Sequence, residues 1–211
     1  NSLPFAKWTC YDAGVHSACI VRWPGVIKPG SVSDALVEYV DIVPTFVDIA
    51  GGKPLAKVDG ESFKPVLTGK KKAHKEYSFS LQTTRGINAG SPYYGIRSVY
   101  DGRYRYIVNL TPEATFQNVE TKSPLFKKWK SLAETDSHAK AMTIKYQHRP
   151  AIELYDVKND PYCMKNLAED AKQASTISRL DKELKRWMKD CGDEGQPTEM
   201  RAFEHMPGKR K

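Results

Sequence analysis

One lysine near the start of the chain is the residue best suited to do chemistry. Lys7 lies between small and aromatic residues in the stretch PFAKWTCYDAGVHSACIVRWPG, residues 4–25, just before an apolar run. An ammonium group is a compact point charge with three hydrogen-bond donors, so it suits a negatively charged group on a substrate. Without any wider motif, the simpler interpretation is an exposed lysine that precedes a strand.

The four cysteines do not follow a metal-binding pattern. Cys10, Cys19, Cys163 and Cys191 show no C-x-x-C spacing and no histidine at the intervals typical of zinc sites. Two disulfides remain compatible with the sequence. Because Cys19 falls in an apolar run and Cys191 on the apolar side of an expected helix, the pattern favours buried thiols instead.

The charge balance leaves two interpretations open. The 211 residues carry a formal net charge of +8, so a polyanion is a reasonable partner, and nucleic acid and sulfated polysaccharide fit the charge equally well. Alternatively, acidic residues in the remainder of a longer protein balance this positive net charge. The basic clusters GKKKAHK (69–75) and PGKRK (207–211) have the composition of a solvated loop and a tail. No apolar run is long enough to cross a bilayer, and no targeting peptide is visible, so we expect no membrane partner.

The elements that must position Lys7 begin with a strand, a turn and a helix. The apolar residues 18–23 predict a buried strand that ends at Pro24-Gly25. A helix follows over 41–50, with Asp41 as its N-cap and Gly51 as its C-terminal stop. Val43, Phe46, Val47 and Ala50 share one apolar face of this helix. A strand, turn and helix of this kind belong to an α/β layer, and 53–75 reads as a connector.

Beyond the connector, the pattern changes to antiparallel β-structure. Residues 77–84 and 152–157 predict strands, and Asp101-Gly102 joins two alternating runs as the loop of a hairpin. The apolar stripe between Ser175 and Gly192 predicts an amphipathic helix that packs on the sheet. Residues 111–150 read as a partly helical insertion and 193–211 as a loosely attached tail.

Several separate stretches then resemble one family. In order along the chain they are KWTCYDAGV (7–15), WPG (23–25), VDIVPTFVDIAG (40–51), DGESFKPVLTG (59–69), ELYDVKNDP (153–161) and NLA (166–168). Together they resemble the C-terminal half of a type I, formylglycine-dependent sulfatase over about residues 4–190. The path through residues 93–161 is most similar to the sulfamidase, or heparan N-sulfatase, branch and its bacterial relatives.

The resemblance implies a fold and a compartment. Residues 1–70 would be the α/β end piece of an alkaline-phosphatase-like sulfatase domain. Residues 71–192 would form a smaller α+β subdomain with an antiparallel sheet and a packed C-terminal helix, followed by the tail 193–211. Members of the family work in the periplasm, outside the cell or in lysosomes.

The resemblance also implies a role for Lys7. The basic residue at this position of the family motif contacts the sulfate group, so the whole enzyme would hydrolyse sulfate esters or N-sulfate groups of a glycosaminoglycan-type saccharide. Arg85, His148 and Arg149 are candidate substrate contacts, because loops of the smaller domain border the cleft in this family; the alternative is that each is exposed or structurally paired. Many relatives have arginine where His16 stands, which puts local packing in doubt more than chemistry.

Other parts of the family site are absent from this sequence. No C/S-x-P-S/A-R motif, the source of formylglycine, is found, since Cys10 precedes Tyr-Asp-Ala-Gly and Cys163 precedes Met-Lys-Asn-Leu. The acidic residues that hold calcium would also lie upstream, so we expect no metal in this piece. We therefore expect a C-terminal fragment, inactive alone, whose partners are the N-terminal sulfatase portion and a sulfated saccharide, not nucleic acid. The alternatives are a non-enzymatic basic module that binds polyanions, and a phosphatase or phosphodiesterase of the same superfamily.

Overall fold

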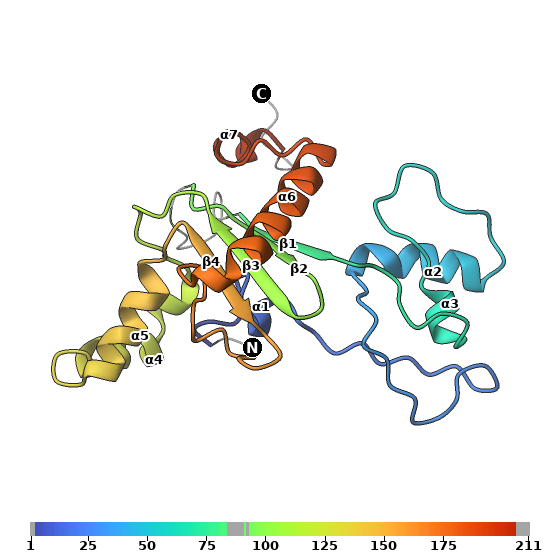
Figure 1. Ribbon diagram of the computed structural model, residues 1–211, viewed down its shortest axis with the longest axis horizontal. Coiled ribbons are helices and arrows are strands. Elements are labelled where there is room, and N and C mark those ends of the chain that lie inside the picture. Colours follow the sequence, from blue (N-terminus) through green and yellow to red (C-terminus); the bar gives the residue numbers. More distant parts are fainter. Residues whose placement is uncertain (1–2, 84–90, 92, 206–211) are drawn as a thin grey trace. The chain divides into compact units, whose positions relative to one another are not determined.

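A computed structural model of the protein describes residues 3–83, 91 and 93–205 (Figure 1). Its contacts divide the chain into two compact units. The first, which we call the sheet unit, comprises residues 1–17 and 79–211, and the second unit comprises 18–78. The expected division was at residue 70. The structure instead groups the segment around Lys7 with the antiparallel sheet, for reasons that its side-chain contacts explain below.

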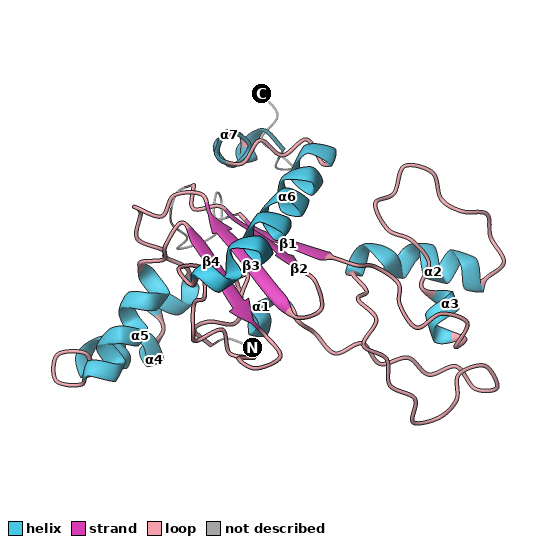
Figure 2. Cartoon of the chain, in the orientation of Figure 1, coloured by secondary structure: helices cyan, strands magenta, loops and turns pink. Residues whose placement is uncertain are grey.

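The sheet unit contains four strands in the hydrogen-bonded order β1-β2-β3-β4 (Figure 2). Their bounds are β1 Ser78–Gln82, β2 Ile96–Tyr100, β3 Tyr104–Asn109 and β4 Ile152–Asp156. Strands β2 and β3 pair antiparallel, as do β3 and β4. The predicted hairpin is confirmed, but its turn lies one residue further on. Asp101 still pairs with Tyr104, and the Asp101 carboxylate accepts hydrogen bonds from the Arg103 and Tyr104 amides.

The two faces of the sheet have different neighbours. Alternate side chains of a strand point to opposite faces. Helix α6, Ala174–Asp190, crosses one face and contacts β2 and β3 (Figure 1). It buries Leu180 and Leu184, as its apolar stripe predicted. The other face carries Ile107 and Tyr155, and these belong to a core cluster with Tyr11 from the segment around Lys7.

The insertion after β3 folds as a helical hairpin. Helix α4, Pro124–Leu132, begins where the Ser123 hydroxyl accepts a hydrogen bond from the Phe126 amide. Helix α5, Ser137–Gln147, begins where the Asp136 carboxylate accepts from the Ala139 amide. Both are side-chain N-caps of the usual kind. Shorter helices are α1 Asp12–Val15, α7 Gln196–Met200, and the 3-10 turns η2 Val119–Lys122, η3 Ala171–Gln173 and η4 Ala202–His205.

The second unit is built around one buried carboxylate. It contains η1 Tyr39–Asp41, α2 Ile42–Ile49 and α3 Lys64–Leu67. The helix over 41–50 is confirmed, but Asp41 does not cap it with its side chain. Instead the fully buried carboxylate accepts from the Glu38 and Glu61 amides and pairs with Lys75 at 2.8 Å. Lys75 and His74 thus belong to a structural network, so the GKKKAHK cluster is not wholly a solvated loop.

Two sequence-based expectations about burial are wrong. Residues 18–23 form no strand, and Ile20 is 92% exposed. A strand needs a neighbour to pair its backbone, and the described residues supply none to this run. Cys19 and Cys191 are exposed, whereas Cys10 and Cys163 are the buried thiols. None of the helices among the described residues has the length and apolar character to span a membrane.

Candidate functional site

Lys7 projects into solvent from a tightly wound turn. Phe5 and Trp8, on either side of it, both have a φ of +62°, a left-handed conformation that costs a residue other than glycine of the order of 1–2 kcal/mol. The hydroxyl of Thr9 donates to the Ala6 carbonyl at 2.7 Å and accepts from the Tyr11 amide. The Lys7 ammonium lies 4.7 Å from the centre of the Trp8 ring, a cation–π distance. The surrounding structure therefore holds a strained turn that presents one cation.

The turn is packed closely against the short helix α1. A Cβ atom on Gly14 would lie 2.4 Å from the Ala6 carbonyl oxygen and 2.6 Å from the Thr9 carbonyl oxygen. Both contacts are shorter than any that real side chains make, so only glycine allows this approach. The G of the DAGV stretch is thus required by the geometry of the turn itself.

Two side chains fasten this segment to the sheet. The Tyr11 hydroxyl donates to the Glu153 carboxylate on β4 at 2.9 Å. The Asp12 carboxylate accepts from the Arg105 guanidinium on β3 at 2.8 Å, and both side chains are almost fully buried. His16 lies 3.1 Å from the other oxygen of Asp12, so it pairs with this carboxylate as well. These bonds explain why residues 3–17 belong to the sheet unit.

A buried polar cluster lies beneath the turn. Glu153 is 1% exposed and accepts hydrogen bonds from Tyr11, Tyr155 and Asn109. Burial raises the pKa of the Tyr155 hydroxyl far above its usual range, and the neighbouring Glu153 raises it further. The phenols therefore stay protonated and act as hydrogen-bond donors. The buried side chain of Glu153 thus has hydrogen-bond partners for both of its oxygens.

Of the three other candidate residues, the structure describes Arg149 and His148. The Arg149 guanidinium is buried, 3.8 Å from the centre of the Phe116 ring and 5.0 Å from that of Tyr11, and its Nε donates to the Tyr146 carbonyl. Arg149 is therefore a buried cation that packs against Tyr11 of the Lys7 segment. This position corresponds to the alternative interpretation of Arg149, a structurally paired side chain. His148 is exposed at the end of α5. Arg85 lies outside the described residues.

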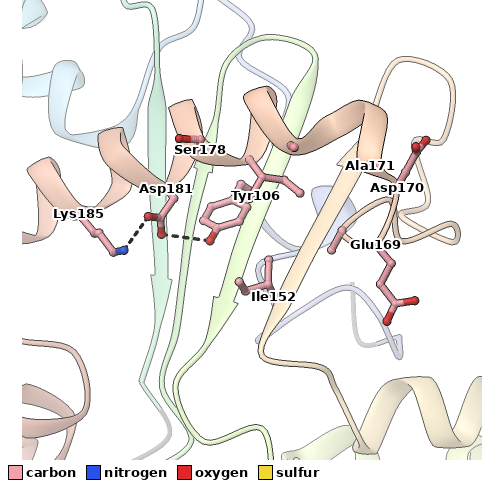
Figure 3. A pocket seen from close by; sticks show the side chains of 11 residues that line it. Tyr106, Ile152, Glu169, Asp170, Ala171, Ser178, Asp181 and Lys185 are labelled. Atoms are coloured by element: carbon pink, nitrogen blue, oxygen red, sulfur yellow. Dashed lines mark hydrogen bonds and ion pairs between the residues drawn. The ribbon is translucent and has the colours of Figure 1, made fainter.

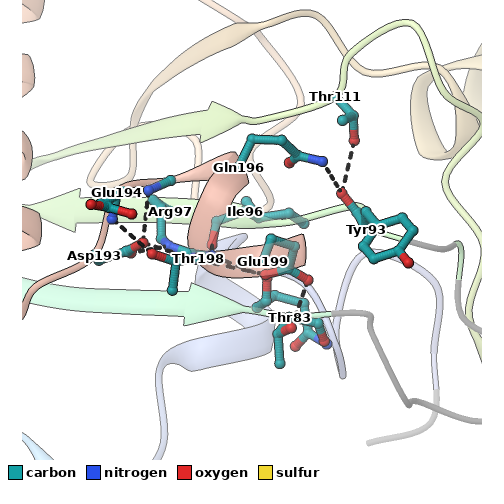
Figure 4. A network of polar contacts seen from close by, with 12 residues as sticks. Thr83, Tyr93, Ile96, Arg97, Thr111, Asp193, Glu194, Gln196, Thr198 and Glu199 are labelled. Carbon is teal, nitrogen blue, oxygen red and sulfur yellow. Dashed lines mark hydrogen bonds and ion pairs between the residues drawn. The ribbon is translucent and has the colours of Figure 1, made fainter. Parts of the chain in front are cut away.

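The segment that precedes Arg85 is nevertheless held in place (Figure 4). Thr83 donates to the Glu199 carboxylate at 2.6 Å, and Glu199 is 1% exposed. Arg97 of β2 binds Asp193 at 2.5 Å and lies 3.7 Å from Glu199. Buried contacts therefore join Asp193 and Glu199 to the sheet, in a segment that the sequence predicted to be a loosely attached tail.

No residues that would hold the family's cofactors come together in the described ranges. Burial raises the pKa of the Cys10 thiol to about 11, and that of the Cys163 thiol likewise to about 11, so neither is a thiolate nucleophile at neutral pH. No group of three or more His, Cys, Asp or Glu residues in the described parts of the chain is arranged to hold a metal ion. These described residues therefore do not fit a calcium site.

A concave surface lies between α6 and the sheet (Figure 3). It encloses about 450 Å³ and is lined by Tyr106, Ile152 and residues of α6. The Asp181 carboxylate in this hollow is already hydrogen-bonded. It accepts from the Tyr106 hydroxyl at 3.1 Å and from the Lys185 ammonium at 2.6 Å. The one basic side chain that lines this hollow, Lys185, is thus already paired with Asp181, so the hollow is less suited to bind an anion than the exposed ammonium of Lys7.

Sequence reasoning missed the residues that support Lys7. Tyr11 and Asp12 stand in the quoted motif. Their partners, Glu153 for Tyr11 and Arg105 for Asp12, lie far along the chain on strands with ordinary alternating patterns. One signal was present: both partners are charged residues placed where a strand pattern expects inward-facing side chains. A charge at such a position needs a partner from another element.

Comparisons with known proteins agree with the motif. The model of the family described as N-sulphoglucosamine sulphohydrolase, C-terminal, matches residues 4–124, more than half of the chain. An ulvan-active sulfatase of Formosa agariphila is 36% identical over 187 residues, which are 89% of this chain and 36% of that protein. An N-acetylglucosamine-6-O-sulfatase of Bacteroides thetaiotaomicron is 26% identical over 201 residues, 92% of this chain and 29% of that protein.

A solved structure extends the comparison to the fold. A protein in complex with its substrate D-glucosamine-2-N,6-O-disulfate has a TM-score of 0.58 at 21% identity, over 84% of this chain and 29% of that chain. The predicted fold class, with an antiparallel sheet and a packed C-terminal helix, is confirmed by the structure and by this likeness. The chain spans about a third of the length of the curated relatives it matches. It belongs to the sulfatase family described as N-sulphoglucosamine sulphohydrolase, C-terminal.

Proposed function

We propose that the whole protein hydrolyses sulfate esters or N-sulfate groups of an anionic saccharide, and that Lys7 binds the sulfate group. The observation that carries the proposal is the Lys7 turn, which presents one exposed cation and is fastened from below by Tyr11 and Asp12. Membership of a sulfatase family supports the reaction class. The names of the relatives, which include an ulvan-active sulfatase and an N-acetylglucosamine-6-O-sulfatase, support a sulfated saccharide as the substrate.

The chemistry asked of Lys7 is electrostatic. Cleavage of an S–O or S–N bond places negative charge on the sulfuryl oxygens and on the departing atom. A cation that is already in place stabilises this charge more in the transition state than in the ground state. The strained turn, the Gly14 contact and the two anchors keep the ammonium in position, so little reorganisation is needed when substrate binds. Removal of one such group typically costs about 100- to 1,000-fold in rate.

The finer assignments are part of the same proposal. We infer an N-sulfated or O-sulfated glycosaminoglycan-type substrate. His148, which is exposed, would be one further saccharide contact, and Arg85 would be another. The placement of Arg149 in the core favours a positioning role for it over direct contact. Calcium and formylglycine would be supplied by the N-terminal portion of the sulfatase. A compartment outside the cytoplasm, either periplasmic, extracellular or lysosomal, follows only from the family.

The 211-residue chain alone should be inactive. Its buried thiols are not nucleophiles at neutral pH, and its described residues do not form a metal site. Lys7 alone can attract a sulfate group but cannot attack it. Hydrolysis of an aryl sulfate by the purified chain would contradict this part of the proposal.

The test is made on the complete polypeptide. Lys7→Ala should lower kcat/KM on a sulfated saccharide by about 100- to 1,000-fold, and Lys7→Arg should restore part of the loss. Lys158→Ala, which removes an exposed lysine elsewhere in the sheet unit, is the matched control and should leave the rate unchanged. Equal rates for Lys7→Ala and Lys158→Ala would refute the assignment. Activity on phosphodiesters but not on sulfates would favour the phosphodiesterase alternative.

A further inference from the structure

The helical hairpin formed by α4 and α5 carries a dense positive charge. Helix α4 has no acidic residue in its nine positions and has three exposed lysines, which are Lys127, Lys128 and Lys130. Lys122, just before α4, and Lys140, on α5, are exposed as well. We call these five residues the α4–α5 lysines.

These charges are not neutralised within the part of the chain that the structure describes. No carboxylate oxygen of the described residues lies within 4.0 Å of an ammonium group of the α4–α5 lysines. The loop between the two helices contains Glu134 and Asp136, and Asp136 is already engaged as the cap of α5. On α6, by contrast, Lys185 pairs with Asp181 one turn away. A group of like charges without partners creates a positive potential that attracts a polyanion.

The hairpin cannot hide these lysines by rotating α4, because the opposite side of that helix is packed. Phe126 is fully buried, and its ring centre lies 5.3 Å from that of Tyr146 on α5. Trp129 packs against the same core cluster, with its ring centre 6.1 Å from that of Phe126. These aromatic side chains are therefore engaged within the protein and are not free to insert into a lipid surface, as an amphipathic helix on a membrane requires.

The base of the hairpin adjoins the Lys7 turn. The ring centre of Phe5, in that turn, lies 5.0 Å from that of Tyr146. Phe126 contacts Tyr146 as well, and Lys130 follows Phe126 by about one helical turn, roughly 5.4 Å along the axis. The Lys7 turn and the α4–α5 lysines thus belong to neighbouring parts of the sheet unit that are packed together through aromatic rings.

We propose that the α4–α5 lysines form a second anion site, which binds a sulfated polysaccharide chain beyond the sugar whose sulfate group lies at Lys7. The inference rests on the proposed function for the identity of this polymer. The family model matches residues 4–124, so the match ends where α4 begins. Apart from Lys122, the α4–α5 lysines lie outside the matched segment.

The chemistry of the surface favours a saccharide polymer over nucleic acid. A lysine ammonium is a compact point charge on a flexible stem, so several of them can adapt to sulfate groups at varied positions along a chain. Proteins that bind single-stranded nucleic acid without sequence preference usually add aromatic side chains on which the bases stack. The aromatic residues of α4, Phe126 and Trp129, pack against the core cluster instead.

Heparin, used as a sulfated polysaccharide probe, tests the proposal in a binding experiment on the complete polypeptide. The α4 variant carries Lys127→Gln, Lys128→Gln and Lys130→Gln. The α6 variant is the matched control and carries the same change at three exposed lysines of the same unit, Lys182, Lys185 and Lys189. Calorimetric titration at low ionic strength should show at least about tenfold weaker binding for the α4 variant and at most about a twofold change for the α6 variant.

The other outcomes of this titration overturn the proposal. Equal weakening in the two variants would show that heparin responds only to net charge. Tighter binding of a DNA duplex than of heparin, lost in the α4 variant, would assign the surface to nucleic acid. Binding of phosphatidylserine vesicles in place of heparin would assign it to a membrane. Equal unfolding temperatures of the two variants, measured by circular dichroism, verify that lost binding is not lost folding.

A kinetic readout separates this site from the Lys7 site. On a sulfated polymer, the α4 variant should show a KM about tenfold higher with little change in kcat, because the lysines hold the polymer equally in the ground state and the transition state. An equal ratio of kcat/KM for polymer to kcat/KM for a sulfated monosaccharide in the α4 and α6 variants would contradict the proposal.

The two proposals can fail separately. Heparin binding that depends on the α4–α5 lysines, in a complete polypeptide that hydrolyses no sulfate, would refute the proposed function and sustain the second site. Sulfate hydrolysis that depends on Lys7, with unaltered heparin binding by the α4 variant, would sustain the proposed function and refute the second site.

Discussion

The ion pair between Asp12 and Arg105 should be the strongest single fastening of the Lys7 turn. The two charges are 2.8 Å apart, and their side chains are 10% and 5% exposed. With an effective dielectric constant of about 20, their attraction is about 6 kcal/mol before desolvation is counted. Removing one partner of a buried pair typically costs about 3–5 kcal/mol, because the other charge is left without compensation. His16 still contacts Asp12, so we expect the lower end of this range for Arg105→Met.

Urea unfolding followed by circular dichroism measures this loss. Arg103→Met is the matched control, because Arg103 lies two residues away and pairs with Asp156 while itself half exposed, and an exposed pair contributes little. Combining Arg105→Met with Asp12→Asn should recover part of the loss, since no buried charge then remains unpaired. If Arg105→Met costs less than about 1 kcal/mol, or no more than Arg103→Met, the buried pair does not fasten the turn.

Three further predictions concern the cysteines, Asp193 and Gly14. At pH 8, iodoacetamide should modify exposed Cys19 and Cys191 in the native chain but spare Cys10 and Cys163, whose pKa values burial raises to about 11; rapid labelling of all four, read by mass spectrometry, would contradict the structure. Burial raises the pKa of the Asp193 carboxyl, but hydrogen bonds from Arg97 and the Gly195 amide outweigh it and leave the pKa below its usual value. The stability from this carboxylate is therefore complete above about pH 4 and is lost as the pH falls through the lowered pKa. Asp193→Asn should flatten the acid side of a plot of unfolding temperature against pH, and an unchanged slope would argue against the pair. Gly14→Ala should lower the unfolding temperature and the activity of the complete polypeptide together, because the added methyl group overlaps two carbonyl oxygens; a neutral effect would show that the turn can relax.

Local patterns were sufficient to predict the antiparallel part of the fold. The alternation in β2 and β3 and the glycine in their turn specify a hairpin within a few residues, and the stripe on α6 specifies which side packs. The turn was misplaced by one residue because the Asp101 side chain, rather than its backbone position, organises it. An aspartate that binds the amides after it is a local signal that the dipeptide pattern does not include.

The candidate site was predictable only in part. Lys7 stands out in its motif, but the contacts that hold it join residues far apart in the chain; Tyr11 and Glu153 are separated by 142 positions. The failures in the second unit have another physical cause. Residues 18–23 and the apolar side chains Val43 and Phe46 of α2 have the composition of buried elements, yet Ile20, Val43 and Phe46 are exposed. An apolar pattern predicts burial but does not identify the element that would cover it.

The position of Lys7 relative to a bound sulfate group is the most direct test of the central claim. It can be measured in a crystal structure of the complete polypeptide with a sulfated saccharide. The account predicts that the Lys7 ammonium lies about 2.7–3.2 Å from a sulfuryl oxygen, with the turn still fastened by Tyr11 and Asp12. A sulfate group bound elsewhere, with Lys7 pointing to solvent, would contradict it.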